Sequence, residues 1–142
     1  MAEASATGQD LSSAPFRVAF RVRDYECDLQ GIVNNAVYQH YLEHARHEFL
    51  RSKGFSFAEL TSRGVVLVVV RAELDYLRPL RPGDAFEVHL RCQRLGRVRH
   101  LFLQEILRED GVPVLSARIE WTTIDSTGKP RRLEGGLETL FS

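Results

Sequence analysis

One segment of this chain repeats its apolar residues with the period of a long helix, and the other regular segments repeat theirs with the period of a strand. Beyond Asn35, apolar side chains recur every three or four positions, which predicts a helix over about residues 36–52. Asn34 or Asn35 can cap the start of this helix, and Gly54 can end it. One helix covers only one face of a sheet, so we expect an antiparallel sheet whose remaining surface receives a second copy of the chain.

The strands are marked by alternating apolar and polar residues with turn signals between them. Residues 16–23 alternate in this way before the helix, and Ser56 with Glu59 forms a capping box for a short helical turn after it. Four further strands are predicted over about residues 65–76, 86–92, 98–107 and 114–124. Connections of hairpin length make the last strands antiparallel. The predicted fold class is therefore α+β, in the order β-α-β-β-β-β.

Length and composition are those of one globular domain. A chain of 142 residues buries roughly two thirds of its unfolded surface on folding, and its 44% hydrophobic and 27% charged residues are ordinary for a folded protein. We expect residues 1–15 to form a flexible tail and residues 16–142 to form a single domain without internal repeats. No apolar run approaches the ~20 residues needed for a membrane span.

Charge and cysteine content exclude several classes of protein. The 19 basic and 19 acidic residues cancel, so no overall field draws the chain to nucleic acid or to an anionic membrane. Cys27 and Cys92 are too few for a disulfide framework and lack metal-ligand spacing, which predicts reduced thiols. Residues 1–15 contain no Lys or Arg, unlike a targeting segment. We therefore expect a cytoplasmic protein, or a plastid protein if a transit peptide was removed.

The residues able to carry chemistry are concentrated in residues 24–50. Within this stretch, Asp28 precedes Gly31 and the predicted start of the helix near Asn35. The first N–H groups of a helix have no internal partner and carry a partial positive charge. A carbonyl oxygen held there accepts hydrogen bonds that strengthen as negative charge develops on it. Asp28, on a loop folded over the sheet, can reach the carbonyl carbon or a water beside it, which makes a minimal site for acyl transfer.

A specific resemblance begins at this point. The run Asp28-Leu29-Gln30-Gly31-Ile32-Val33-Asn34-Asn35, followed by Tyr38 and the helical stretch up to Arg46, resembles the active-site loop and central helix of hotdog-fold acyl thioesterases. These are the relatives of 4-hydroxybenzoyl-CoA thioesterase. The run is most similar to the plant-type acyl-lipid and acyl-carrier-protein (ACP) thioesterase branch, whose motif also reads Asp-x-x-Gly-x-Val-Asn-Asn. The predicted order of elements agrees with the hotdog fold over about residues 16–141.

The resemblance assigns roles to individual residues. It implies that Asp28 is the catalytic carboxylate, acting as a general base for water or as a nucleophile through an acyl-enzyme anhydride. It implies that the backbone N–H of Asn35, with or without help from its side chain, faces the thioester carbonyl. Gly31 matches the glycine that lets the loop turn closely under the substrate. The substrate-binding residues that we expect are Gly31, Val33, Asn34 and Tyr38.

The resemblance also implies the reaction and the partners. The expected activity is hydrolysis of a fatty acyl-CoA or acyl-ACP thioester, including 3-oxoacyl groups, to the free acid, with no metal or other cofactor. The expected assembly is a homodimer or homotetramer in which each acyl tunnel is walled in part by the neighbouring subunit. Residues 65–70, with Tyr38, Tyr41 and Phe49, are candidates for the tunnel wall, although packing in the core explains each of them as well.

Several alternatives remain open on the residues alone. An Asp before a Gly is commonly a turn residue, and Asn34 and Asn35 are common helix caps. Asp24 and Glu26 are interpreted as solvated or structural carboxylates. The rival function is a non-catalytic module that binds acyl-CoA or regulates another protein. A hydratase on the same scaffold would need a histidine in the loop, and the loop has none.

The helix itself raises two further alternatives. Glu43 resembles the helix-borne glutamate of another hotdog branch, but it fits an ion pair with Arg46 or His47 as well. His40, His44 and His47 share a helix, yet no other ligand type accompanies them, which favours a solvent or interface face over a metal site.

Basic charge is carried almost entirely by arginine, with 17 Arg and two Lys in the chain. Between Arg78 and Arg108 there are seven arginines and three acids. Guanidinium groups suit phosphates, so this region is a candidate for holding the nucleotide end of CoA or for meeting an acidic carrier protein. The alternative is that these side chains lie on the outer faces of strands.

Overall fold

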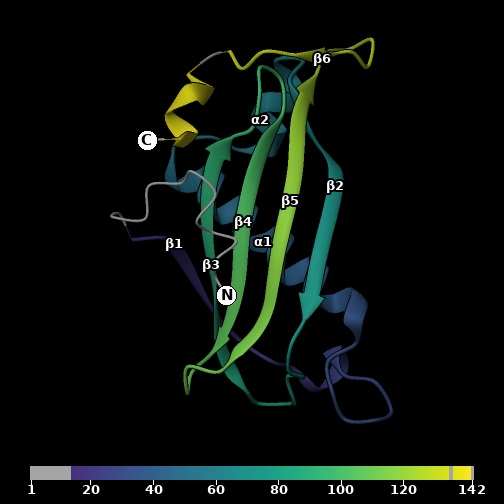
Figure 1. Ribbon diagram of the computed structural model, residues 1–142. Coiled ribbons are helices and arrows are strands. Elements are labelled where there is room, and N and C mark those ends of the chain that lie inside the picture. Colours follow the sequence, from purple (N-terminus) through teal and green to yellow (C-terminus); the bar gives the residue numbers. More distant parts are fainter. Residues whose placement is uncertain (1–13, 135, 142) are drawn as a thin grey trace.

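A curved antiparallel sheet with one long helix across its concave side forms the structure, a computed structural model that describes residues 14–134 and 136–141 (Figure 1). Residues 1–13 of the predicted tail lie outside the described residues. The strands are β1 (Phe16–Arg21), β2 (Val66–Tyr76), β3 (Ala85–Arg94), β4 (His100–Arg108), β5 (Pro113–Ile124) and β6 (Pro130–Arg131). The helices are α1 (Asn35–Ser52) and α2 (Phe57–Ser62), with the 3-10 turns η2 (Asp24–Glu26) and η3 (Leu137–Phe141).

Helix α1 forms where the apolar period predicted it and begins one residue earlier. The side chain of Asn34 caps it by accepting the N–H of Ala36, and the turn after it ends at Gly54, whose φ of 89° suits glycine. The predicted cap of α2 is also present, because the hydroxyl of Ser56 accepts the N–H of Glu59 at 3.1 Å. The buried face of α1 consists of Tyr38, Tyr41, Leu42, Ala45, Phe49 and Leu50.

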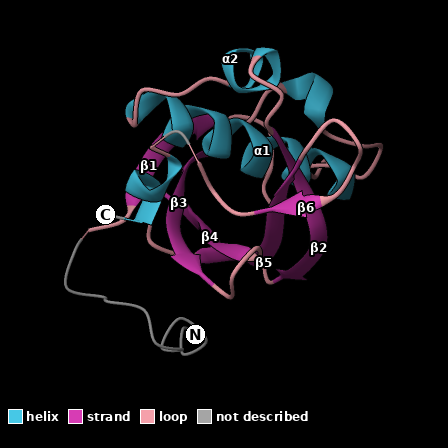
Figure 2. Cartoon of the chain, turned by 90° about the horizontal axis from the view of Figure 1, so that it is seen from above, coloured by secondary structure: helices cyan, strands magenta, loops and turns pink. Residues whose placement is uncertain are grey.

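The main sheet has the order β1-β3-β4-β5-β2, and every neighbouring pair is antiparallel. Figure 2 shows α1 lying along the concave side of this sheet, with α2 beyond it. The core between helix and sheet contains the fully buried side chains of Leu42, Leu90 and Trp121. The architecture is the predicted hotdog fold, with the predicted order of elements.

The strands differ from the predicted ones in their ends and in one addition. The strand expected to begin at Val98 begins at His100, because the N–H groups of Leu95 and Gly96 both bond to the carbonyl of Arg99 and close a hairpin turn. The two-residue strand β6 pairs with the end of β5 and was not predicted. It is too short to have an alternating pattern of its own.

Strand β2 is an edge of the sheet, and within the described residues it pairs only with β5. Its 11 residues include Val69 and Val70, which are 49% and 41% exposed beside a bulge in the pairing. A long edge with exposed apolar side chains and free backbone groups is a surface on which another strand can pair. None of the helices in the described part of the chain is long and apolar enough to cross a membrane.

Candidate active site

The loop between β1 and α1 folds into a narrow hairpin that carries Asp28 near its tip. Cys27 and Val33 form an isolated antiparallel bridge, and beyond it the N–H of Asp28 bonds to the carbonyl of Ile32 at 2.9 Å. The N–H of Gly31 closes the turn on the carbonyl of Asp28 at 3.0 Å. Gly31 has a φ of 77°, a conformation that glycine adopts without steric cost. The predicted glycine is therefore at the tight turn of this loop.

The carboxylate of Asp28 is exposed and is held by its own turn. One oxygen accepts the N–H of Gln30 at 2.8 Å, and the other has no hydrogen-bond donor among the described residues. This bond is the turn-forming role that the sequence left open for an Asp before a Gly. It fixes the orientation of the carboxylate and leaves one oxygen available for a water or a substrate.

The backbone N–H groups at the start of α1 differ in whether they have a hydrogen-bond acceptor. The side chain of Asn34 accepts the N–H of Ala36 at 2.9 Å, and its carbonyl accepts the N–H of Val37 at 2.9 Å. Asn34 is therefore the cap. The N–H of Asn35 has no acceptor in the part of the chain that the structure describes. A free donor at the positive end of an 18-residue helix is suited to an anionic oxygen.

A buried residue of the β2–β3 connection ties this loop to the helix. The carbonyl of Leu80 accepts the N–H of Val33 at 2.9 Å, and the N–H of Leu80 donates to the hydroxyl of Tyr38 at 3.1 Å. Burial raises the pKa of Tyr38, which keeps its hydroxyl protonated. Tyr76 packs edge-on against Tyr38, and its hydroxyl donates to the carbonyl of Asn35 at 3.3 Å. Val33 and Tyr38 are both almost fully buried.

The other carboxylates and the thiol of the loop have structural surroundings. Glu26 accepts the hydroxyl of Tyr41 at 2.7 Å and the N–H of Arg23 at 2.9 Å, as its structural interpretation predicted. Cys27 is half-buried, and burial followed by the nearby carboxylates raises the pKa of its thiol. A raised pKa disfavours the thiolate that a cysteine nucleophile needs.

A groove begins at the start of α1 and runs between this helix and β2. Its volume is about 360 Å³, within the range of small-molecule sites. Arg46, which lines the groove, donates from its guanidinium to the side chain of buried Gln104 at 3.0 Å, and Gln104 donates in turn to the carbonyl of Leu42 at 3.0 Å. The groove is lined by Ala36, Gln39, His40, Leu42, Glu43, Arg46, Val69, Ala72 and Ile119.

Glu43 and the histidines of α1, which the sequence raised as alternative functional residues, have contacts within the fold. Glu43 lies 3.9 Å from His47 in an intrahelical pair, and the ring of His47 packs on Phe57. His44 packs edge-on against Phe20. Across residues 14–134 and 136–141, no three side chains of His, Cys, Asp or Glu gather as a metal site would need.

No sequence pattern predicts that two further residues contact the site. Leu80 and Tyr76 lie about 40 positions after the helix start, and no spacing rule connects them with it. The turn signal around residues 81–84 indicates a change of direction, but it does not indicate which loop the turn meets. These contacts depend on the tertiary fold alone.

An antiparallel sheet curved around one long helix is the hotdog fold. The chain belongs to the thioesterase superfamily, whose sequence profile matches residues 30–115. It is a thioester hydrolase.

Two relatives are named as thioesterases, and a solved structure shares the fold. The chain is 36% identical to the chloroplastic acyl-acyl carrier protein thioesterase ATL3 of Arabidopsis thaliana over 87% of this chain and 66% of that protein. It is 34% identical to the long-chain acyl-CoA thioesterase FadM of Escherichia coli over 82% of this chain and 89% of that protein. The crystal structure of a hypothetical protein from Aquifex aeolicus matches with a TM-score of 0.84 and 35% identity, over 90% of this chain and all of that chain.

Proposed function

We propose that this chain hydrolyses fatty acyl thioesters of CoA or of acyl carrier protein to the free acid, with 3-oxoacyl groups among its substrates. The observation that carries the proposal is the unused N–H of Asn35 at the positive end of α1, beside the loop that presents Asp28. The names of relatives support both carriers, because ATL3 is named for acyl-ACP and FadM for acyl-CoA.

The proposed reaction places the thioester carbonyl oxygen on the N–H of Asn35. The negative charge that develops on this oxygen is stabilised by that donor and by the helix dipole. Asp28 removes a proton from water, whose oxygen attacks the carbonyl carbon, and the carbon–sulfur bond then breaks. The departing sulfur takes up a proton, so the products are one carboxylic acid and one thiol. Direct attack by Asp28 through an anhydride is the alternative route.

The same proposal assigns the acyl group to the groove between α1 and β2. This groove begins at Ala36, next to the proposed oxyanion donor, and its floor includes Ile119 of the sheet. Gly31 and Val33 shape the loop above the thioester, Asn34 caps the helix, and Tyr38 supports the loop from below.

A second copy of the chain is part of this proposal. The open side of the groove borders β2, whose backbone and exposed valines are free to pair. Antiparallel pairing of two β2 strands about a two-fold axis extends the sheet and closes the groove, which makes a homodimer the smallest working unit. Association of two such dimers would give the homotetramer.

Thiol release from a panel of acyl-CoA and acyl-ACP substrates tests the proposed activity. We expect turnover by the wild-type chain and a loss of ~100-fold or more in kcat for Asp28→Asn, because general acid–base groups contribute at least that factor. Asp24→Asn is the matched control, since Asp24 is an exposed carboxylate of the same loop with no side-chain partner among the described residues. Tight binding of acyl-CoA without thiol release would instead support the non-catalytic module.

A further inference from the structure

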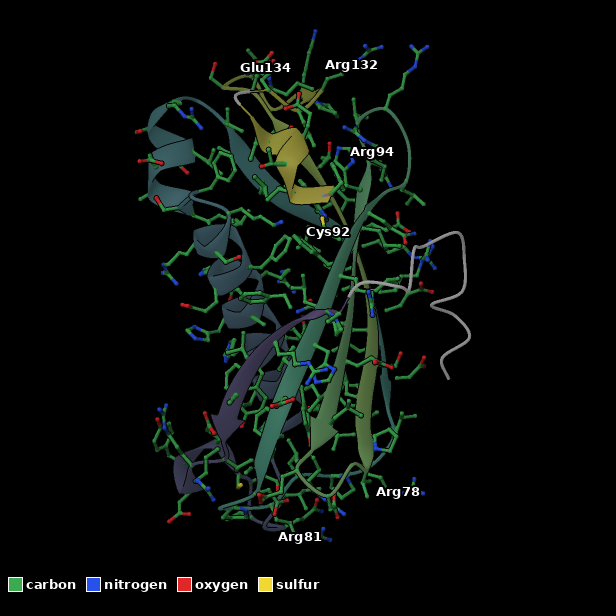
Figure 3. All side chains as sticks on the ribbon, turned by 90° about the vertical axis from the view of Figure 1, so that its left-hand side faces the viewer. Arg78, Arg81, Cys92, Arg94, Arg132 and Glu134 are labelled. Carbon is green, nitrogen blue, oxygen red and sulfur yellow. The ribbon has the colours of Figure 1, made fainter. Side chains whose placement is uncertain are left out.

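The seven arginines between Arg78 and Arg108 do not form one surface. Arg94 lies over the ring of Phe141 at 4.6 Å, at the opposite end of the molecule from Arg78 and Arg81 (Figure 3). Arg99 pairs with Glu120 at 3.2 Å, and Arg108 pairs with Asp110 at 2.8 Å. The charge cluster of the sequence is therefore dispersed by the fold.

Arg78 and Arg81 are the two members that flank Leu80, the residue whose backbone bonds to the Asp28 loop and to α1. Both are exposed, and neither guanidinium has an ion pair with a carboxylate of the described residues. The guanidinium of Arg78 donates to the carbonyl of its neighbour Leu77 at 2.8 Å. Arg81 uses its backbone N–H, which donates to the carboxylate of Asp84 at 2.9 Å, and its side chain has no partner in the described part of the chain.

The position of both arginines is fixed by the buried residue that lies between them. Leu80 bonds to Val33 of the loop that carries Asp28 at 2.9 Å and to Tyr38 of α1 at 3.1 Å. These two hydrogen bonds hold the backbone of Leu80 against the loop and the helix. The backbone segment that carries both arginines is therefore held next to the loop that carries Asp28.

Among the described residues, no carboxylate of the loops around Leu80 forms an ion pair with Arg78 or Arg81. The carboxylates of Asp28, Glu26 and Asp84 each accept a backbone N–H of their own turn, at 2.8 to 2.9 Å. The positive charges of Arg78 and Arg81 are thus available to a ligand. Guanidinium groups bind phosphate through paired N–H donors, which distinguishes them from a general positive field.

We propose that Arg78 and Arg81 bind the phosphate of the phosphopantetheine arm that carries the acyl group. This inference rests on the proposed function, because it places the thioester of the same arm at Asn35. The phosphopantetheine phosphate is common to CoA and to acyl carrier protein, so one pair of arginines serves both carriers. The pair acts on binding and takes no part in the chemical step.

The test compares ligands that differ only in this phosphate. We expect the double variant Arg78→Ala/Arg81→Ala to bind 4′-phosphopantetheine about tenfold more weakly in calorimetry, with unchanged binding of pantetheine. With acyl-phosphopantetheine and acyl-CoA as substrates, KM rises by a similar factor and kcat is unchanged. Acyl-pantetheine, which lacks the phosphate, is hydrolysed equally by the wild-type chain and the variant.

Controls separate this proposal from the proposed function. Arg132→Ala removes an exposed arginine at the opposite end of the molecule and leaves binding of phosphopantetheine unchanged (Figure 3). Hydrolysis of acyl-pantetheine by the wild-type chain tests the proposed function alone, because this substrate has no phosphate. Calorimetry with 4′-phosphopantetheine tests the phosphate site alone, because no thioester is hydrolysed. Unchanged binding of phosphopantetheine, or an equal loss for pantetheine, overturns the proposal. A loss confined to acyl-ACP also overturns it, since that result defines a protein docking surface.

Discussion

The hydroxyl of Tyr38 accepts a hydrogen bond of 3.1 Å from the backbone N–H of Leu80, a residue 42 positions later in the chain. Both residues are buried, and the carbonyl of Leu80 also accepts the N–H of Val33. One buried point therefore holds α1, the loop that carries Asp28 and the β2–β3 connection together. The geometry of the candidate site depends on a side chain that does not have to touch the substrate.

Tyr38→Phe removes the acceptor and leaves the buried N–H of Leu80 without a partner. An unsatisfied buried donor costs about 1–3 kcal/mol, so we expect the free energy of unfolding in urea to fall by that amount. Tyr25→Phe is the control, because Tyr25 is 77% exposed. Equal stability of Tyr38→Phe and the wild-type chain would show that the hydroxyl is not needed to hold this contact.

The local parts of the fold could be predicted from the sequence, and the contacts between distant segments could not. The period of α1, the cap at Asn34 and the hairpin turns depend on neighbours within a few residues. The bonds of Leu80 and Tyr76 join segments about 40 residues apart, and no periodicity contains that information. The roles of Asp28 and Asn35 rest on the place of Asp28 ahead of the helix start and on the family resemblance, and they stay predictions until variants are assayed.

Gly31→Ala tests the turn that presents Asp28. An added Cβ meets no atom within 4 Å, so crowding is absent and only the φ of 77° opposes the change. We expect a loss of ~1 kcal/mol in unfolding free energy and a lower kcat/KM, because alanine disfavours the left-handed conformation. Gly31→Asn retains more activity, since asparagine tolerates this region better. Gly96→Ala, at a glycine without positive φ and with open space around it, leaves both quantities unchanged.

Asn34→Ala separates capping from catalysis at the start of α1. The side chain of Asn34 satisfies the N–H of Ala36, so its removal costs ~1 kcal/mol of unfolding free energy. Asn34→Ser restores a capping oxygen, and we expect it to recover stability and thiol release together. Recovery of stability without recovery of activity would mean that the amide of Asn34 contacts the substrate.

His100 is a buried imidazole with no hydrogen bond on either ring nitrogen within the described residues. Its ring lies between Trp121 and Phe141, with centroid separations of 4.8 and 5.2 Å. Burial, with a smaller effect from the charge of Arg94, lowers the pKa of His100 to about 4. The folded protein therefore holds this side chain neutral under conditions in which an exposed histidine is protonated.

This lowered pKa makes stability depend on pH in a defined window. Above pH ~6.5 His100 is neutral in both the folded and the unfolded chain and contributes no slope. As the pH falls from ~6.5 to ~4, the unfolded chain binds a proton that the folded chain does not, so stability falls, by at most about 3 kcal/mol. We expect His100→Phe to remove this part of the slope in urea titrations at successive pH values, whereas exposed His40→Gln leaves it in place. Identical slopes for His100→Phe and the wild-type chain would contradict a neutral buried imidazole.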